Sequence, residues 1–389
     1  MKVITGNRVP IKMWAEQIET HAMEQAMDLA SLPFSFHHVA LMPDCHTGLG
    51  MPIGGVLATT GCIVPNAVGV DIGCGMCAVK TNLREERLSR KILLKIVEKI
   101  KEVIPLGFDH QQEAQDESLM PQGYNLDDLP KTKILYQSAR KQLGTLGGGN
   151  HFIEIQREVE DGMVWIMIHS GSRNLGKKIA AEYGNRAKFL NNLWFSQSLP
   201  GLEFLPMATP EARNYLKEMK YCVDFALANR QLMMHRICEI MQSFLPEISF
   251  EPMINIAHNY AAWEKHFGQD VIVHRKGATS ARKGEIGIIP GSQGTPSYIV
   301  EGLGNPDSFM SSSHGAGRVM GRKAAIYNLN LAHEQELLES QGIIHSVFEA
   351  RDLDEAPSAY KDIEEVMLNQ RDLVKPLVKL RALAVIKGK

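Results

Sequence analysis

The stretch HFIEIQREVEDGMVWIMIHS, residues 151–170, holds two apolar-rich runs on either side of Asp161-Gly162. An Asp-Gly pair between two such runs is a strong signal for a β-hairpin. The hairpin brings His151 and His169 towards the same end. A two-residue loop would leave these histidines about three residues out of step, so the turn alone does not place both on one metal ion.

The regions on both sides of this hairpin alternate between strand and helix patterns. Residues 40–80 and 250–305 are rich in glycine and β-branched residues and predict short strands joined by glycine turns. Residues 83–104 have helical periodicity. A polar stretch over 109–130 predicts a surface loop.

A second helical region opens at Thr209-Pro210-Glu211, which suits an N-cap, a first helical position and a first turn. The run from there to Leu245 lacks glycine and proline and predicts one long helix or two stacked helices. Helices are expected again beyond Arg318. The pattern as a whole predicts an α+β fold.

The 389 residues exceed a usual single domain, but an α+β enzyme can close a chain of this length into one unit. We find no internal repeat and no linker-like composition shift, so a single domain over 1–389 is expected. No apolar run approaches the roughly 18 residues of a membrane helix, and the start lacks signal-peptide features. A cytoplasmic protein without membrane partners is the expectation.

The net charge of −2 argues against indiscriminate coating of nucleic acid, although a local basic groove stays open. Two segments could supply such a groove. They are residues 274–283 and the acid-free tail from Val374, with Lys375, Lys379, Arg381, Lys387 and Lys389.

The six cysteines are too scattered for a disulfide framework. Cys74 and Cys77 form a Cys-x-x-Cys pair without the strand–helix context of a redox motif. In VGVDIGCGM (68–76), Asp71 and Cys74 stand three apart on a turn, where carboxylate and thiolate can reach one cation and sulfur can bridge two. The alternative is an Asp turn beside a small buried cysteine.

Further histidines follow glycine or precede asparagine. LGTLGGGNHFIE (143–154) places three glycines before Asn150-His151, and their amides could cradle phosphate. The loop is no P-loop, because Gly-Lys-Ser/Thr is missing; a flexible loop before a strand is the alternative. His169 precedes a loop with Arg173, and His258-Asn259 follows an apolar run. Each histidine alone is typical of a polar residue at the rim of a site. Together with an Asp and a Cys, the histidines form a ligand set that suits manganese or zinc.

FMSSSHGAGRVMG (309–321) places His314 between three serines and Gly-Ala-Gly. A structural loop, a dinucleotide-binding turn and a nucleophile beside a bound nucleotide compete here. The dinucleotide turn is disfavoured, because the preceding DSFMSSSH does not predict a buried strand. The nucleophile needs a neutral, accessible His314 near a metal-polarised phosphate. No Lys-x-Asp-Gly motif offers a lysine instead, and PGSQGTPSY (290–298) offers a second phosphate loop.

Taken together, these motifs resemble those of the RtcB-type RNA ligases, which are GTP- and manganese-dependent enzymes that join RNA ends in tRNA splicing and RNA repair. The resemblance runs nearly end to end and implies the family's own α+β fold, neither Rossmann nor P-loop. The motifs that carry it occur in this order: PDCHTGLGMPIGG (43–55), VGVDIGCGM, LGGGNHFIE (146–154), HSGSRNLG (169–176), HNYAAWE (258–264), HRKGATSARKGE (274–285), PGSQGTPSY, SHGAGR (313–318), DEAPSAYKDIEEV (354–366) and AVIKGK (384–389).

The resemblance implies a role for each matching residue. Cys74 would bridge two manganese ions, with Asp71 and His151 completing one site and His169 and His258 the other. His314 would become covalently guanylated. The implied GTP-binding residues are Asn150, His151, Phe152, Ile153, Glu154, His258, Asn259, Pro290, Gly291, Ser292, Gln293, Ser297, His314, Gly315, Ala316, Gly317, Tyr360 and Lys387.

The implied activity joins RNA 3′-phosphate or 2′,3′-cyclic phosphate ends to 5′-hydroxyl ends through an RNA-3′-pp-G intermediate, with an archease-like activator as a further partner. Departures at 45–50, at Ser280 and at the extra Lys389 suggest a divergent bacterial branch devoted to RNA repair. Two rival hypotheses stay open. A binuclear-metal phosphodiesterase acting on RNA ends leaves His314 without a role, and a non-catalytic RNA-binding module needs no metal.

Overall fold

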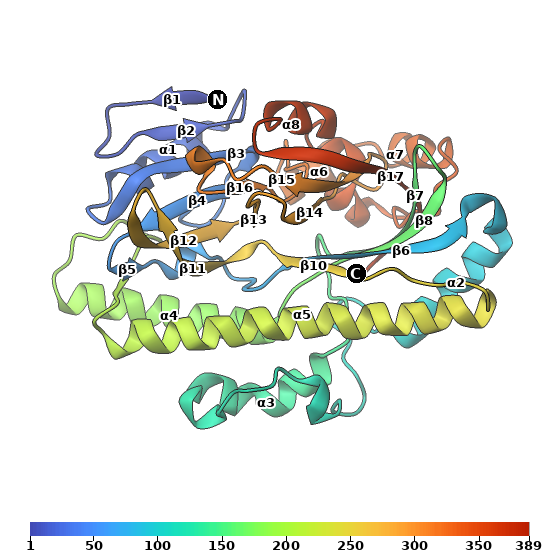
Figure 1. The fold of residues 1–389 in the computed structure, drawn as a ribbon, viewed down its shortest axis with the longest axis horizontal. Helices are drawn as coiled ribbons and strands as arrows, with labels where there is room; N and C mark the ends of the chain where they lie inside the picture. Colours follow the sequence, from blue (N-terminus) through green and yellow to red (C-terminus); the bar gives the residue numbers. More distant parts are fainter. Residues whose placement is uncertain (389) are drawn as a thin grey trace.

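The computed structural model describes residues 1–388 and confirms the α+β class (Figure 1). Lys389, which belongs to the predicted basic tail, lies outside the described residues. Most strands belong to two sheets with antiparallel neighbours, except for the parallel pair β2–β3. The first sheet has the order β1 (Lys2–Ile4), β2 (Ile11–Met13), β3 (Ser35–His46), β4 (Ile53–Thr59), β12 (Gln269–Lys276), β11 (Asn259–His266).

The second sheet carries the strand ends that hold most of the candidate site. Its two edge strands, β10 and β14, contact each other, so the sheet curls into a barrel-like form. The fold is therefore not of the Rossmann or P-loop class. Its order is β10 (Ile254–Ala257), β6 (Gly75–Arg84), β8 (Met163–Ser170), β7 (Phe152–Glu158), β17 (Val374–Lys387), β15 (Ser297–Gly302), β14 (Ile286–Ile289).

Two small sheets and eight α-helices complete the described part of the chain. The small sheets pair β5 (Cys62–Ile63) with β9 (Leu205–Pro206) and β13 (Ala278–Ser280) with β16 (Ser311–Ser313). The helices are α1 (Thr20–Ser31), α2 (Arg90–Val103), α3 (Pro130–Gln142), α4 (Arg173–Leu193), α5 (Pro210–Phe244), α6 (Arg322–Asn328), α7 (Leu331–Glu339) and α8 (Ile363–Asn369).

The hairpin predicted over 151–170 is present as β7 and β8, but its register differs from the prediction. Phe152 pairs with His169, so His151 and His169 are one residue out of step rather than three. The reason is the loop. The last pair is Arg157–Val164, and the Gly162 N–H donates to the Glu158 carbonyl at 3.2 Å, so the turn is wider than Asp161-Gly162 alone.

The run from Thr209 forms one continuous helix, α5, and the Thr209 hydroxyl accepts a hydrogen bond from the Ala212 N–H at 3.3 Å. This helix runs along one side of the sheets, and α3 lies beyond it (Figure 1). The helix expected over 83–104 begins only at Arg90, because β6 continues to Arg84. The polar stretch 109–130 contains two short 3-10 helices, Glu117–Leu119 and Leu126–Asp128.

Two further expectations need correction. DSFMSSSH does contain a buried strand, β16, although it pairs antiparallel with β13 in a two-stranded sheet and so gives no dinucleotide fold. The segment 274–283 is largely withdrawn from solvent, because Arg275 and Lys276 are buried, and Arg275 is paired with Glu264. Within residues 1–388, no helix has the length and apolar character that crossing a membrane requires.

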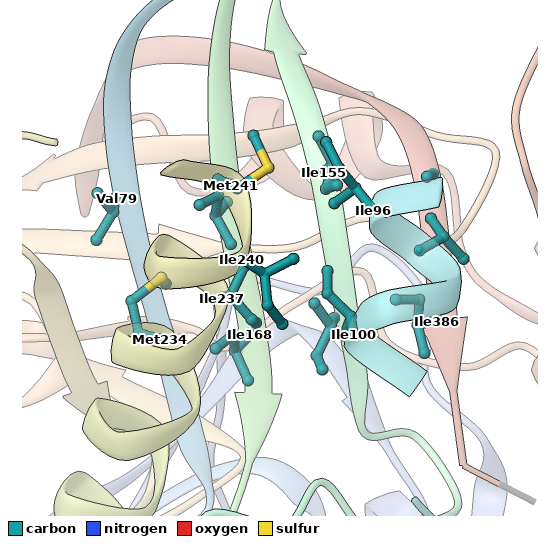
Figure 2. Packing of buried hydrophobic residues seen from close by; sticks show 14 of the residues in the cluster. Val79, Ile96, Ile100, Ile155, Ile168, Met234, Ile237, Ile240, Met241 and Ile386 are labelled. Atoms are coloured by element: carbon teal, nitrogen blue, oxygen red, sulfur yellow. The ribbon is translucent and has the colours of Figure 1, made fainter. Parts of the chain in front are cut away.

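Figure 2 shows the core that supports the second sheet. Ile237 and Met241 of α5 meet Ile168 of β8 and Ile100 of α2 there. All four side chains are fully buried. Burial of aliphatic side chains of this size contributes roughly 1.5–3 kcal/mol each relative to exposure. The apolar contacts of α5 therefore hold the strands whose ends carry the candidate site.

We expect Ile237→Ala to lower the free energy of unfolding by about 2–5 kcal/mol, because the fully buried side chain would leave a cavity between α5 and the sheet. Chemical denaturation with circular dichroism measures the change. Leu94→Ala on α2 is the matched control, since Leu94 is exposed and its loss should cost under about 0.5 kcal/mol. Equal effects of the two substitutions would contradict the assignment of Ile237 to the core.

Candidate active site

Three strand ends of the second sheet bring the predicted metal ligands together. Gly75, the first residue of β6, pairs with Ser170 of β8 on one side and with Ala257 of β10 on the other. Cys74, His169 and His258 stand directly beside these paired positions in sequence. The ladder therefore places one thiol and two imidazoles at a common edge.

The buried side chain of Arg230 on α5 fixes these strand ends. Its guanidinium donates to the carbonyls of Gly73 (3.1 Å), Ser170 (2.8 Å) and Ile256 (3.1 Å), and to the side chain of Asn255 (2.8 Å). Gly73, Ser170 and Ile256 lie within two residues of Cys74, His169 and His258. One guanidinium thus sets the spacing of the three segments.

Short distances join the five predicted ligands. The Cys74 Sγ lies 3.4 Å from His151 Nε2 and 3.3 Å from His169 Nε2. His151 Nε2 lies 3.1 Å from Asp71 Oδ2, and His169 Nε2 lies 3.4 Å from His258 Nε2. The side chains form two groups that share Cys74, and the ligand atoms of each lie within 4.8 Å of one another.

The backbone sets the tautomers of two of these histidines. His151 Nδ1 donates to the Leu146 carbonyl at 3.0 Å, and His169 Nδ1 donates to the Asn150 carbonyl at 3.1 Å. Because a carbonyl only accepts, these bonds favour a proton on Nδ1 and a lone pair on Nε2 facing the cluster, while Arg173 Nη1 also lies 3.3 Å from His151 Nδ1. His258 Nδ1 is buried and has no hydrogen-bond partner among residues 1–388.

Burial also sets the charge of the cluster. It raises the pKa of the Cys74 thiol well above its ordinary value, and the Asp71 carboxylate adds to this effect. Burial lowers the pKa of His169 and of His258 well below the usual range. The imidazoles of His169 and His258 are therefore neutral ligands, and a cation in the cluster would supply the charge that favours a thiolate. The sulfur, nitrogen and oxygen donors fit a transition metal ion.

His314 follows β16 and lies beside this cluster, with its ring centroid 4.8 Å from that of His258. Its Nδ1 donates to Asp44 Oδ2 at 2.6 Å, and the backbone N–H groups of His314 and Gly315 donate to the same oxygen at 3.1 and 3.3 Å. In the neutral ring, this arrangement keeps the proton on Nδ1 and leaves the lone pair on Nε2.

Asp44 was not singled out from the sequence, although it lies in the PDCH motif. Its side chain is fully buried, and its Oδ1 has no hydrogen-bond partner within the described residues. Gly317 closes the His314 loop over it. A Cβ at Gly317 would lie 2.2 Å from the Asp44 carbonyl oxygen, and its φ of +74° is also unfavourable for other residues.

A pocket opens beside His314 and is lined by most of the predicted nucleotide-binding residues. Those that line it are Asn150, Phe152, Glu154, Pro290, Gly291, Ser292, Gln293, His314, Gly315, Ala316, Gly317, Tyr360 and Lys387.

The other predicted GTP-binding residues lie behind the pocket wall. Ile153 faces the core, since side chains alternate along β7. His151 and His258 belong to the metal-type groups. Asn259 accepts from the Gly277 N–H at 2.7 Å, and Ser297 accepts from the Gly291 N–H at 3.2 Å, so both support the lining segments.

The sequence analysis also missed five residues that line the pocket: His46, Ile53, Arg318, Arg322 and Glu355. Glu355 forms ion pairs with Arg318, Arg322 and Lys387. Its carboxylate lies 3.2 Å from Arg318 Nη1, 2.7 Å from Arg322 Nη1 and 2.9 Å from Lys387 Nζ. Arg318 and Glu355 lie within the motifs quoted above, and this position in a motif was the signal that could have identified them. Only the fold brings their charges together.

The surroundings of the pocket shift the pKa values of two of its carboxyl groups in opposite directions. Burial alone would raise the pKa of Glu355, but Lys387 and Arg322 outweigh it and lower that pKa to about 2. Burial raises the pKa of Glu154 to about 7, against the opposing effects of Gln156 and Lys387. The pocket therefore has one fixed carboxylate and one carboxyl group that titrates near neutrality.

We expect Glu355→Gln to destabilise the protein at pH 7 by on the order of 3 kcal/mol, because it leaves buried cations without a counterion. The folded-state pKa is depressed, so this stabilisation is fully present above the ordinary value of 4.5 and is lost as pH falls towards about 2. Denaturation curves of wild type and variant should therefore converge over this range. The exposed Glu365→Gln is the control, and a gap independent of pH would contradict the charge assignment.

Comparisons with known proteins identify the family of this chain. Residues 25–388 match the family described as tRNA-splicing ligase RtcB. The chain is 38% identical to the RNA-splicing ligase RtcB of Escherichia coli strain K12, over 100% of this chain and 99% of that protein. It is 31% identical to the tRNA-splicing ligase RtcB of Pyrobaculum aerophilum, over 98% of this chain and 95% of that protein. The chain belongs to the RtcB family of RNA ligases.

Proposed function

We propose that this protein is a GTP- and manganese-dependent RNA ligase that joins 3′-phosphate or 2′,3′-cyclic phosphate ends to 5′-hydroxyl ends. The observation that carries the proposal is the placement of His314. Its Nδ1 is held by Asp44 at 2.6 Å, so its free Nε2 stands between a pocket of nucleotide-binding type and a cluster of metal-ligand type. A neutral, oriented imidazole is what a nucleophile for phosphate requires.

The pocket wall supports GTP as the nucleotide. Glu154 and Lys387 place a carboxyl acceptor and an ammonium donor together, which suits the donor and acceptor edge of a guanine base. The segments Pro290–Gln293 and Gly315–Gly317 line the same pocket with backbone suited to phosphate oxygens. Tyr360 contributes an aromatic ring, and its hydroxyl donates to Glu355 at 2.5 Å.

The cluster supports two metal ions that share one ligand. Asp71, Cys74 and His151 would hold one manganese, and Cys74, His169 and His258 the other. Metal bound there would offset the negative charge of the reacting phosphate and polarise it.

The proposed steps follow from the residues. His314 Nε2 attacks the α-phosphorus of GTP, pyrophosphate leaves, and GMP becomes bonded to the imidazole, while Asp44 holds the Nδ1 proton. An oxygen of the RNA 3′-phosphate then attacks the same phosphorus and frees His314, giving RNA-3′-pp-G. The 5′-hydroxyl attacks the 3′-terminal phosphorus, and GMP leaves as the phosphodiester forms.

The proposed reaction also implies the substrates and partners of the protein. RNA with these ends, GTP and an archease-like activator are the expected partners, and the cytoplasm is the expected compartment. The divergent motifs favour RNA repair, with tRNA splicing as the other use. A binuclear-metal phosphodiesterase would use the same cluster, but it would leave the oriented His314 and the nucleotide-type pocket without a role.

We expect wild-type protein incubated with manganese and labelled GTP to form an acid-labile, base-stable GMP adduct on His314, as a nitrogen–phosphorus bond should. His314→Ala should abolish the adduct and the joining of 3′-phosphate ends, yet still seal RNA supplied with a preformed 3′-pp-G end. Mass spectrometry locates the adduct. His333→Ala is the matched control, because His333 is an exposed residue of α7. An adduct on another residue would overturn the assignment.

We expect Cys74→Ala to lose bound metal and all joining activity, because the thiolate is the donor shared by both groups. Elemental analysis after dialysis reports the metal content directly. Cys238→Ala on α5, which is half-buried and outside both groups, should keep the metal content and rate of wild type. Sealing by Cys74→Ala at the wild-type rate would refute the bridging role.

A further inference from the structure

A second imidazole faces the pocket beside His314. His46 is the last residue of β3, and its side chain lines the same pocket. Its Nδ1 donates to the backbone carbonyl of Asp44 at 2.9 Å. The proton is therefore on Nδ1, and Nε2 has a lone pair with no hydrogen-bond partner among residues 1–388. Asp44 thus orients two histidines, one through its carboxylate and one through its carbonyl.

The backbone around His46 is held from three sides. Lys361 Nζ donates to the carbonyls of Pro43 (3.1 Å) and Cys45 (2.7 Å). Thr47 N–H donates to a carboxylate oxygen of Glu19 at 3.2 Å. His46 itself pairs with Ile53 of β4. These contacts fix the direction of the imidazole independently of any bound ligand.

The ring of His46 is neutral under physiological conditions. Burial lowers its pKa to about 4, and nearby His314 and Lys361 also lower it, against the opposing effects of the Asp44 carbonyl and carboxylate. A neutral ring with a free Nε2 accepts a proton or a hydroxyl hydrogen bond. It offers a phosphate no positive charge.

The other strong acceptors of the pocket have partners or another proposed role, and Glu154 is the proposed contact to guanine. Glu154 accepts from Gln156 at 2.6 Å, and Glu355 is held by three cationic side chains. His169 Nε2 faces the Cys74 sulfur. His314 is the proposed carrier of GMP. The remaining polar groups are amides, hydroxyls and cations, which are weak bases at neutral pH.

Among the three proposed steps, only the last must remove a proton from an attacking hydroxyl. The first uses the free lone pair of His314, and the second uses an oxygen of a phosphate that is already ionised. Resting on the proposed function, we propose that His46 Nε2 is the general base of the sealing step. As the 5′-oxygen bonds to the 3′-terminal phosphorus, its hydroxyl proton passes to His46, and the bond from that phosphorus to the bridging oxygen breaks to release GMP. The imidazolium then returns the proton to water.

The test separates the steps on intact protein with manganese. In His46→Asn the side-chain amide can still donate to the Asp44 carbonyl, but the acceptor at the Nε2 position is gone. We expect the GMP adduct on His314 to form within threefold of the wild-type rate. Sealing of preformed RNA-3′-pp-G to a 5′-hydroxyl end should fall at least 100-fold, the lower range for general-base catalysis.

A pH profile of the sealing step gives the second readout. Wild-type sealing should be level from about pH 5 to 8, because the base is already unprotonated there, and should fall below that range. Sealing by His46→Asn should instead rise with pH across the same range, since hydroxide replaces the missing base. His110→Ala, in an exposed loop, is the control for loss of a histidine.

Two results would overturn the inference alone. One is wild-type sealing by His46→Asn with an unchanged pH profile. The other is an equal loss of adduct formation and sealing, which would make His46 a positioning residue for His314. A wild-type protein that forms no adduct and seals no RNA would overturn the proposed function itself, and the inference with it.

Discussion

The buried guanidinium of Arg230 is the contact on which the site depends. Its N–H groups donate to the carbonyls of Gly73, Ser170 and Ile256, which belong to three different segments. A buried donor without an acceptor costs on the order of 1–3 kcal/mol, so the guanidinium is satisfied only when these segments meet around it. Their meeting also brings Cys74, His169 and His258 within contact of one another. The same bonds therefore stabilise the fold and assemble the cluster.

Asn229, the neighbour of Arg230, extends this arrangement to the glycine loop. Its side chain accepts from the N–H groups of Gly144 and Thr145 at 2.7 and 3.1 Å and donates to the Gly171 carbonyl at 3.2 Å. The loop that precedes His151 and the loop that follows His169 are thus tied to one turn of α5. Because α5 is anchored by an apolar core along the second sheet, the positions of the histidines follow from packing far from any ligand.

The sequence predicted the parts of this molecule that depend on local pattern. Hydrophobic periodicity and turn residues were sufficient to predict the β7–β8 hairpin and helix α5, because those signals lie within the segments themselves. They gave the wrong hairpin register, since a loop from Val159 to Gly162 and an Asp-Gly turn look alike in composition. They also missed Asp44, Arg318, Arg322 and Glu355, whose ion-pair partners lie far away in the chain, and His46, which only the fold brings into the same pocket. The family resemblance named ligands that spacing could not place, and the fold brings those same side chains into two groups around one sulfur.

Asp44 orients both the proposed nucleophile, His314, and the second histidine, His46. A buried carboxylate that accepts three hydrogen bonds on one oxygen resists movement, because any shift would leave donors at His314 or Gly315 unpaired. Its carbonyl accepts from His46 Nδ1, so one residue orients both rings. Both present Nε2 to the pocket, and neither depends on a ligand to do so. Such preorganisation matters for phosphoryl transfer, in which positioning and fixed charges supply most of the rate enhancement.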